Sequence, residues 1–425
     1  MTRNIYKVRL DNTGIIHMAS KRKDWLNMFR ISVHFKENID SVIIQKALDN
    51  IIKRFPTIAS RITTSLFWYY QQPIKKAPKI EKDTALLKPM SHKELSRCAF
   101  RVLYSGKSLH VEIFHSLTDG RGAMIFVKSL AYEYLKLKHK ITINHSNDIL
   151  FAEDEILKKE VVDSYHKVKV KVKSHNKNNY NKVYQLKGNK INQLNLEKFI
   201  LNITELKSLA KKMDVSITVL ICSIIILAII NIQKKEVSKK RQKPVKIFLP
   251  IDLRNMFKSS TLRNFVLYIK PQINPISQGE HINEIIYSIK RQFAEGLSKE
   301  KIQNTMNKNV RLQNNIIIKY IPLFLKKLFM QMAFQFSEKT TCLTVSNIGL
   351  IKLDKRMAEY IESFDCILNT RSDTPYNCGI ISYHDKLYIN IIRNIDNPVL
   401  ENEIVKIFTS LNIKWEVEQK SYTKK

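Results

Sequence analysis

Cysteine is scarce in this sequence, and its few cysteines are not grouped. The chain has 425 residues and five cysteines, and no two of them form a C-x-x-C pair. Scattered thiols of this kind are typical of a reducing compartment, so we expect free cysteines and a cytoplasmic protein. Clusters of His, Cys and carboxylate side chains at metal-ligand spacing are also missing around the candidate histidine described below. We therefore expect no bound metal.

Acidic residues are few compared with basic ones. The chain has 38 Asp and Glu against 72 Lys and Arg, a formal net charge of +34. Such a charge favours nucleic acid or an anionic membrane as a partner. The lysines are spread over the whole chain, however, and no nucleic-acid-binding motif accompanies them. We expect no nucleic-acid partner, although a basic surface could attract an anionic, phosphate-bearing cofactor.

Long hydrophobic runs are also nearly absent. Residues Met1–Asp11 are polar and charged, without the apolar region of a signal peptide. One run, Val215–Gln233, has nineteen residues without a charge, close to the length that spans a bilayer. Ser, Thr, Cys, Asn and Gln dilute the run, and no second such segment occurs. We interpret it as a core helix packed under a sheet and expect no membrane span.

The most informative stretch is Phe114–Gly120. Before it, Ser108–Phe114 alternates apolar and polar residues, which predicts a half-buried strand ending at His115. After Gly120, apolar residues recur at helical spacing. A strand-end imidazole with Asp119 four residues later could act as a general base. The alternative is an ordinary core histidine. Nucleophilic catalysis by Ser116 is disfavoured, because there is no G-x-S-x-G motif.

Strands and helices recur in both halves of the chain, which predicts an α/β fold with two sheets covered by helices. Residues 163–190 lose the apolar pattern and become polar around His175–Asn181. We interpret this stretch as a crossover between domains; a basic edge strand and a basic nucleic-acid-binding arm are the alternatives. The predicted domains are 1–165 and 191–425, joined by the linker 166–190. The other expected elements are strands at 29–35, 246–254 and 341–349, hairpins at 98–115 and 378–392, and helices at 41–55, 282–295 and 401–411.

Several short motifs together resemble the chloramphenicol acetyltransferase-like superfamily of CoA-dependent acyltransferases. This superfamily includes BAHD acyltransferases, condensation domains of peptide synthetases and bacterial alcohol acetyltransferases, and the last group is the most similar. The resemblance covers nearly the whole chain. It lies in Phe29-Arg30-Ile31-Ser32, Arg54-Phe55-Pro56, Phe67-Trp68-Tyr69-Tyr70, the His-x-x-x-Asp-Gly core at 115–120, Pro250-Ile251-Asp252-Leu253-Arg254, Asn264-Phe265 and Ser346-Asn347-Ile348-Gly349.

The resemblance implies two similar lobes with a channel between them and His115 near its middle. In such a fold His115 is the general base, and an acyl group, most simply acetyl, moves from acyl-CoA as co-substrate to a small alcohol. Asp119 has a structural role in this family and pairs with Arg254. Gly120, the next residue, completes the motif. Asn347 lines the channel and stabilises the oxyanion. From the residues alone, Arg254 could equally be an exposed strand-end arginine, and Asn347 a simple turn residue.

One position departs from the family pattern. Many relatives carry two adjacent histidines, and Phe114 occupies the first of these positions here. The strand alternation places Phe114 and His115 on opposite faces, so the change need not remove activity. Two alternatives stay open: a condensation-like enzyme that takes its acyl group from a carrier protein, and a non-catalytic basic binding protein. We expect a monomer with no permanently bound cofactor.

Overall fold

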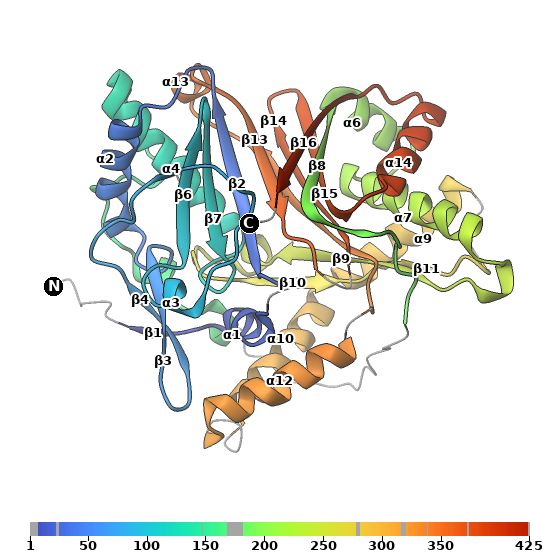
Figure 1. The fold of residues 1–425 in the computed structure, drawn as a ribbon, viewed down its shortest axis with the longest axis horizontal. Helices are drawn as coiled ribbons and strands as arrows, with labels where there is room; N and C mark the ends of the chain where they lie inside the picture. Colours follow the sequence, from blue (N-terminus) through green and yellow to red (C-terminus); the bar gives the residue numbers. More distant parts are fainter. Residues whose placement is uncertain are drawn as a thin grey trace.

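The computed structural model describes residues 7–22, 25–146, 148–167, 182–277, 281–315, 320–337, 339–371 and 374–423. Its two large sheets stand side by side, each with helices on its outer side (Figure 1). The predicted α/β architecture is confirmed. Residues 168–181, which include the polar stretch His175–Asn181, lie outside the described residues, and the predicted domain boundaries stay predictions.

The sheet of the N-terminal half has the strand order β13-β2-β7-β6-β5. Its strands are β2 (Met28–Phe35), β5 (Glu81–Lys82), β6 (Phe100–Ser105), β7 (Ser108–Phe114) and β13 (Ile361–Leu368). The predicted hairpin is confirmed: β6 and β7 pair antiparallel around Gly106, whose φ of +52° suits glycine. Helices α2 (Ser41–Ile51) and α4 (Gly120–His139) pack together on this half. Asp40 caps α2 by accepting from the amides of Val42 and Ile43.

The sheet of the C-terminal half has the order β10-β9-β12-β14-β15-β8-β16, and β11 also pairs with β9. Its strands are β8 (Lys190–Asn202), β9 (Val245–Asp252), β10 (Val266–Ile269), β11 (Gln272–Ile273), β12 (Leu343–Ile351), β14 (Tyr376–Tyr383), β15 (Lys386–Ile395) and β16 (Glu416–Thr423). Its helices are α6 (Ile203–Lys212), α7 (Ile217–Glu236), α9 (Ile282–Gly296) and α14 (Val399–Ser410).

Helix α7 contains the long apolar run. It is long and apolar enough to cross a membrane by length and composition, yet most of it is buried inside the fold. It packs against α9, α14 and β9. Because neighbouring elements cover its apolar side chains, the core-helix prediction is confirmed.

A third, small sheet has the order β1-β4-β3 and lies below the N-terminal half in Figure 1. Its strands are β1 (Val8–Arg9), β3 (Ser60–Thr64) and β4 (Tyr69–Pro73). Helix α12 (Leu323–Ser337) lies along the same lower side and packs on α1 (Asn12–Ser20), with α10 (Lys299–Asn314) nearby. The remaining short helices are α3 (His92–Leu95), α5 (Lys158–Val161), α8 (Arg254–Phe257) and α13 (Lys355–Ala358).

Strand β13 joins the two large sheets. It comes from the C-terminal part of the chain, yet it pairs with β2 at the edge of the N-terminal sheet. It also packs closely on β14 of the other sheet. Gly379 makes this approach possible, because a Cβ on it would lie 2.0 Å from the carbonyl oxygen of Cys366. The backbones of β13 and β14 therefore touch at Gly379, because this residue has no side chain.

This contact gives a stability prediction. Gly379→Ala places a methyl group against a backbone carbonyl that cannot move aside, so we expect a loss of about 2–3 kcal/mol in the free energy of unfolding. Urea unfolding measures it. Gly106→Ala is the control, because a Cβ there meets only Asn38 at 3.9 Å and introduces backbone strain without a clash. Equal stability of Gly379→Ala and the wild-type protein would contradict the close contact of the sheets.

Candidate active site

The loop 115–119 follows β7 and is tied to its surroundings at every residue. The backbone N–H of His115 donates to the carbonyl of Asn27 at 2.8 Å. Ser116 Oγ is buried and donates to the carbonyl of Gly14 at 2.7 Å, so it is not free to act as a nucleophile. The carbonyl of Leu117 accepts from Gln71. These contacts fix the loop against the N-terminal half.

The same loop is held from the other side by the segment 261–265 of the C-terminal half. Thr118 Oγ1 donates to the carbonyl of Leu262 at 2.6 Å. Gly122 allows this approach, because a Cβ on it would lie 2.1 Å from Thr118 Oγ1 and 2.5 Å from the Leu262 carbonyl oxygen. His115 therefore lies where the two halves of the chain meet.

Asp119 has several partners at once. Its carboxylate caps α4 by accepting from the amide of Gly122 at 3.1 Å, and it accepts from the amide of Phe265 at 2.8 Å. Arg254 donates to both of its oxygens, at 3.0 and 2.9 Å. The predicted pairing of Asp119 with Arg254 is thus present. Both side chains are buried, which excludes the alternative of an exposed arginine.

Arg254 keeps its charge within this buried site. Burial acts against the charge, but Asp119 and Asp252 outweigh it, so the pKa of Arg254 is raised. Its guanidinium also donates to the carbonyls of Thr261 and Arg263, at 2.8 and 2.7 Å. These contacts leave Arg254 a role in holding the loops rather than in chemistry.

The imidazole of His115 is oriented by Asn264. Nδ1 of His115 lies 3.3 Å from Oδ1 of Asn264, and Nδ2 of Asn264 faces a carboxylate oxygen of Asp11 at 3.4 Å. In the tautomer with the proton on Nδ1, that nitrogen donates to Oδ1 of Asn264 and Nε2 keeps its lone pair. Burial raises the pKa of Asp11 to about 7, although Arg263 opposes this shift.

A second histidine, His17 on α1, stacks on His115. The ring centroids are 4.1 Å apart and the rings are inclined by 16°. The ring of His17 is held by Asn27, whose Oδ1 lies 3.0 Å from Nδ1 of His17 while its Nδ2 donates to the carbonyl of His17. Asn27 has a φ of +53°, which turns the chain just before β2. Phe29 contacts His115 on another side, with centroids 4.9 Å apart.

Both imidazoles are held in their neutral forms. Burial lowers the pKa of His115 below its ordinary value of 6.5, although its own carbonyl, Asp119 and Asn264 act in the opposite direction. Burial lowers the pKa of His17 further, and a charge on His115 would add to this effect. His115 is only partly exposed, and at neutral pH it is an unprotonated base.

A cavity of about 950 Å³ opens beside the start of α4. Gly120 and Arg254 line it, together with Asn347 and Ile348 from β12. The amide of Asn347 donates to Thr218 Oγ1 at 2.9 Å and accepts from the backbone N–H of Gly349 at 2.8 Å. The structure thus brings Gly120, Arg254 and Asn347 to one cavity. His115 does not line it, so a continuous channel through His115 stays a prediction.

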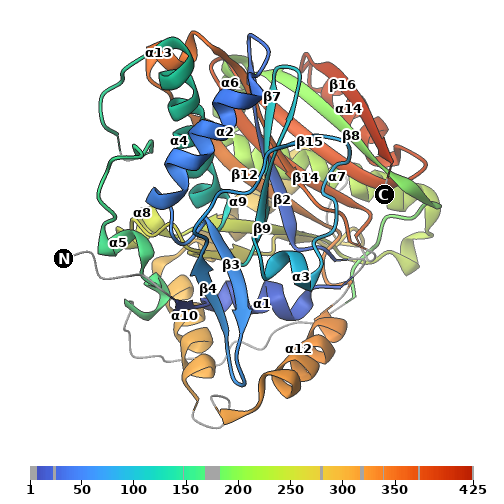
Figure 2. The same cartoon turned by 60° about the vertical axis from the view of Figure 1, so that its left-hand side comes forward.

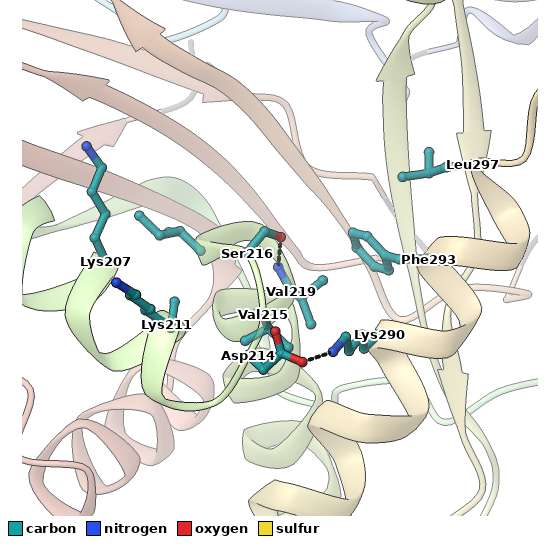
Figure 3. Close-up of a pocket in the computed structure, with 11 residues that line it drawn as sticks. Lys207, Lys211, Asp214, Val215, Ser216, Val219, Lys290, Phe293 and Leu297 are labelled. Atoms are coloured by element: carbon teal, nitrogen blue, oxygen red, sulfur yellow. Dashed lines mark hydrogen bonds and ion pairs between the residues drawn. The ribbon is translucent and has the colours of Figure 1, made fainter.

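A second hollow, of about 570 Å³, lies at the N-terminus of α7 (Figure 3). Lys207 and Lys211 of α6 line one side of it. Lys290 of α9 lines the opposite side and pairs with Asp214 at 2.5 Å. Ser216 caps α7, and Thr218, two residues further on, is the partner of Asn347. The first turn of α7 therefore separates the basic hollow from the cavity near Gly120.

Sequence reasoning did not assign roles to His17, Asn27 and Asp11. Asn264 was part of a motif without a stated function. Only a resemblance in the segment 11–27 could have indicated these residues, because they reach His115 through tertiary contacts. Among the residues that the structure describes, no group of three or more His, Cys, Asp or Glu is placed to hold a metal.

Comparison with known proteins identifies the fold. No protein-family model matches the chain, and no curated protein matches its sequence. Solved structures do match. TRI101 of F. sporotrichioides, in complex with coenzyme A and T-2, has a TM-score of 0.65 at 9% identity, over 96% of this chain and 99% of that one. The trichothecene 15-O-acetyltransferase TRI3 from Fusarium sporotrichioides has a TM-score of 0.62 at 11% identity, over 95% of both chains.

The structure of a condensation domain is about as similar to this chain as those two acetyltransferases are. The starter condensation domain of rhizomide synthetase RzmA, in complex with C8-CoA and Leu-SNAC, has a TM-score of 0.62 at 12% identity, over 96% of this chain and 94% of that one. At sequence identities this low, the structural similarity establishes the fold and no more. The chain therefore has the two-lobed chloramphenicol acetyltransferase-like fold shared by CoA-dependent acyltransferases and condensation domains, as its motifs predicted.

The buried pair gives a prediction for stability. Arg254→Gln leaves Asp119 buried without its counter-charge, so we expect a loss of about 3–5 kcal/mol in the free energy of unfolding. Asp119→Asn/Arg254→Gln should lose less than the sum of the two single variants, because they share one interaction. Arg121→Gln is the control: it breaks a partly exposed pair with Asp148 and should cost less than about 1 kcal/mol. Additive losses would show that Asp119 and Arg254 do not depend on each other.

Proposed function

We propose that this protein is an acyltransferase that moves an acyl group from acyl-CoA to the hydroxyl of a small alcohol, with His115 as the general base. The observation that carries the proposal is the oriented, neutral imidazole of His115. Asn264 directs its Nδ1 proton, and Nε2 is left to accept a proton. The fold shared with enzymes crystallised with coenzyme A supports the choice of donor.

The reaction needs no covalent enzyme intermediate. Nε2 of His115 takes the proton from the acceptor hydroxyl as its oxygen attacks the thioester carbonyl. The resulting tetrahedral intermediate collapses by breaking the carbon–sulfur bond, and the imidazolium returns the proton to the CoA thiolate. The products are an ester and free CoA. His17 stays neutral, so its ring face can stabilise the transient imidazolium of His115 by a cation–π contact.

We assign the phosphates of acyl-CoA to the basic hollow beside α7. Lys207 and Lys211 are exposed lysines on one face of α6, and the N-terminus of the twenty-residue helix α7 adds a positive dipole end. Thr218, in the first turn of α7 that borders this hollow, bonds to Asn347, which lines the cavity near Gly120, so the phosphate site would lie one helical turn away from that cavity. The cytoplasmic location and the monomeric state stay predictions.

The first test is thiol release from acetyl-CoA with a panel of alcohols and amines. Release that requires one acceptor, and that falls by about a thousandfold or more in His115→Ala, is the expected result. Unchanged release in the variant would exclude His115 as the base. Release from acyl groups on a carrier protein, but from no acyl-CoA, would favour the condensation-like alternative.

The pH dependence of kcat/KM follows from the shifted pKa. Protonation removes the base, so activity falls as the pH drops through the pKa of His115, which lies below 6.5. The acid limb should therefore appear below pH 6.5. Asn264→Ala should move this limb to lower pH, because its hydrogen bond favours the protonated ring. An acid limb above pH 6.5 would contradict the assignment.

The assignment of the basic hollow predicts a change in donor binding alone. In Lys207→Gln/Lys211→Gln we expect KM for acetyl-CoA to rise about tenfold with kcat unchanged, because two phosphate contacts are lost. KM for acetyl-pantetheine, which has no nucleotide, should not change. Lys46→Gln/Lys53→Gln, which removes two exposed lysines near α2, is the control. An equal rise for both thioesters would place the phosphates elsewhere.

A further inference from the structure

Helix α12 has an apolar face that no described part of the chain covers. Phe324, Leu328 and Met332 follow one another at intervals of four residues in α12, so they share one face, and Tyr320 lies just before the helix. These three are exposed by 69, 52 and 39%, Tyr320 by 73%, and the adjacent Phe329 by 56%. Isolated exposed apolar residues are common, but four large ones on one helix, with Tyr320 just before it, form a patch that indicates an interaction site.

The helix is fixed to the protein by its other side. It packs on α1, and the backbone N–H of Leu323 donates to the carbonyl of Leu66 at 2.8 Å. Lys326 Nζ donates to the carbonyl of Phe67 at 3.1 Å and lies 4.0 Å from the ring centre of Trp68. Leu66 itself is 65% exposed and extends the apolar patch. Both views place α12 at one edge of the molecule, beside α1 (Figures 1 and 2).

Two lysines, Lys327 of α12 and Lys21 just after α1, lie near each other beside this patch. The helix segment Leu323–Ser337 contains two lysines and no Asp or Glu. Burial and the nearby charge of Lys327 lower the pKa of Lys21, while Glu94 acts in the opposite direction. Lys21 and Lys327 therefore lie close enough to repel each other, so this side of the patch favours an anionic partner.

We infer that the exposed face of α12 docks on a membrane surface that contains anionic lipids. A short helix that exposes Phe, Leu and Met on one side with Lys327 beside them resembles an interfacial membrane helix, which lies in the plane of the headgroups. Tyr320 at its start suits the same boundary. The net charge of +34 adds a long-range attraction to such a surface.

The charges disfavour a second copy of the chain as the occupant. A symmetric dimer through this face would bring the same patch of each copy together, and with it two sets of Lys21 and Lys327. Like charges placed opposite each other weaken such an interface. A bilayer presents apolar chains and negative headgroups at the same time, which matches both parts of the patch.

Cosedimentation with vesicles tests this inference without reference to catalysis. The probes are vesicles of phosphatidylcholine alone and of phosphatidylcholine with roughly 30% phosphatidylserine. Each is used at about 0.1 M and about 0.5 M NaCl, because salt screens the charge contribution and leaves the apolar one. We expect the wild-type protein to bind the anionic vesicles, with part of the binding resistant to salt.

Two pairs of variants separate the two contributions. Phe324→Ser/Leu328→Ser should abolish the salt-resistant part and weaken partitioning about tenfold or more. Lys21→Gln/Lys327→Gln should reduce only the salt-sensitive part. The matched controls are Val42→Ser/Tyr287→Ser, exposed apolar residues on α2 and α9, and Lys46→Gln/Lys53→Gln. Both controls should bind like the wild-type protein, and the melting temperature of each variant checks that the half-buried Lys21 and Lys327 are replaced without loss of the fold.

Three results would overturn the inference. Equal loss of binding in the controls would show a general effect of charge and exposed apolar area. Absence of vesicle binding, with a dimer in sedimentation that Phe324→Ser/Leu328→Ser dissociates, would assign the face to a second copy. Absence of vesicle binding, with Phe324-dependent binding of an acidic acyl carrier protein, would assign it to a protein partner.

Discussion

The carboxylate of Asp119 is the point on which the site depends. It caps α4 in the N-terminal half, and it accepts from Arg254 and from the backbone of Phe265 in the C-terminal half. One buried charge therefore specifies the start of a helix, the path of the loop after His115 and the distance between the two halves. Burying it unpaired would cost several kcal/mol, so any compact arrangement that buries Asp119 away from Arg254 is disfavoured.

His17 explains how the site accommodates Phe114. The side chain of Phe114 is fully buried in the N-terminal core, on the opposite side of the strand from His115. The position that holds the first of two histidines in many relatives therefore contributes to packing here. A second imidazole nevertheless lies next to His115, and it comes from α1 rather than from the adjacent residue. Asn27 holds both residues: its side chain contacts the ring of His17, and its carbonyl accepts from the backbone N–H of His115.

The elements set by local patterns were predictable from the sequence. The 98–115 hairpin follows from alternation and from Gly106 in the turn, and the cap of α2 follows from Asp40 before an apolar helical face. The burial of α7 could be inferred because polar residues dilute the run. The order of the motifs indicated the fold, and the family pattern indicated the pairing of Asp119 with Arg254 across 135 residues.

The features that the sequence did not predict depend on tertiary contacts, which leave no local pattern in the sequence. The sequence Ile361–Leu368 is typical of any short apolar strand. It does not indicate that β13 pairs with β2, which lies more than 300 residues earlier in the chain. The stacking of His17 on His115 arises only when α1 packs beneath the loop. The segment 341–349 was expected to end in a turn, but β12 continues to Ile351 through an irregular register between Asn347 and Leu350.

The position of β13 also bears on how the chain folds during synthesis. The N-terminal sheet begins with β2 but gains its edge strand only when residues 361–368 have left the ribosome. Until then one edge of β2 is open to pairing with other chains. Closing a loop of more than 300 residues makes this a slow, late step in folding. Until β13 pairs with β2, the nascent N-terminal half can aggregate through this open edge. Chaperones that bind such exposed segments would therefore raise the yield of folded protein.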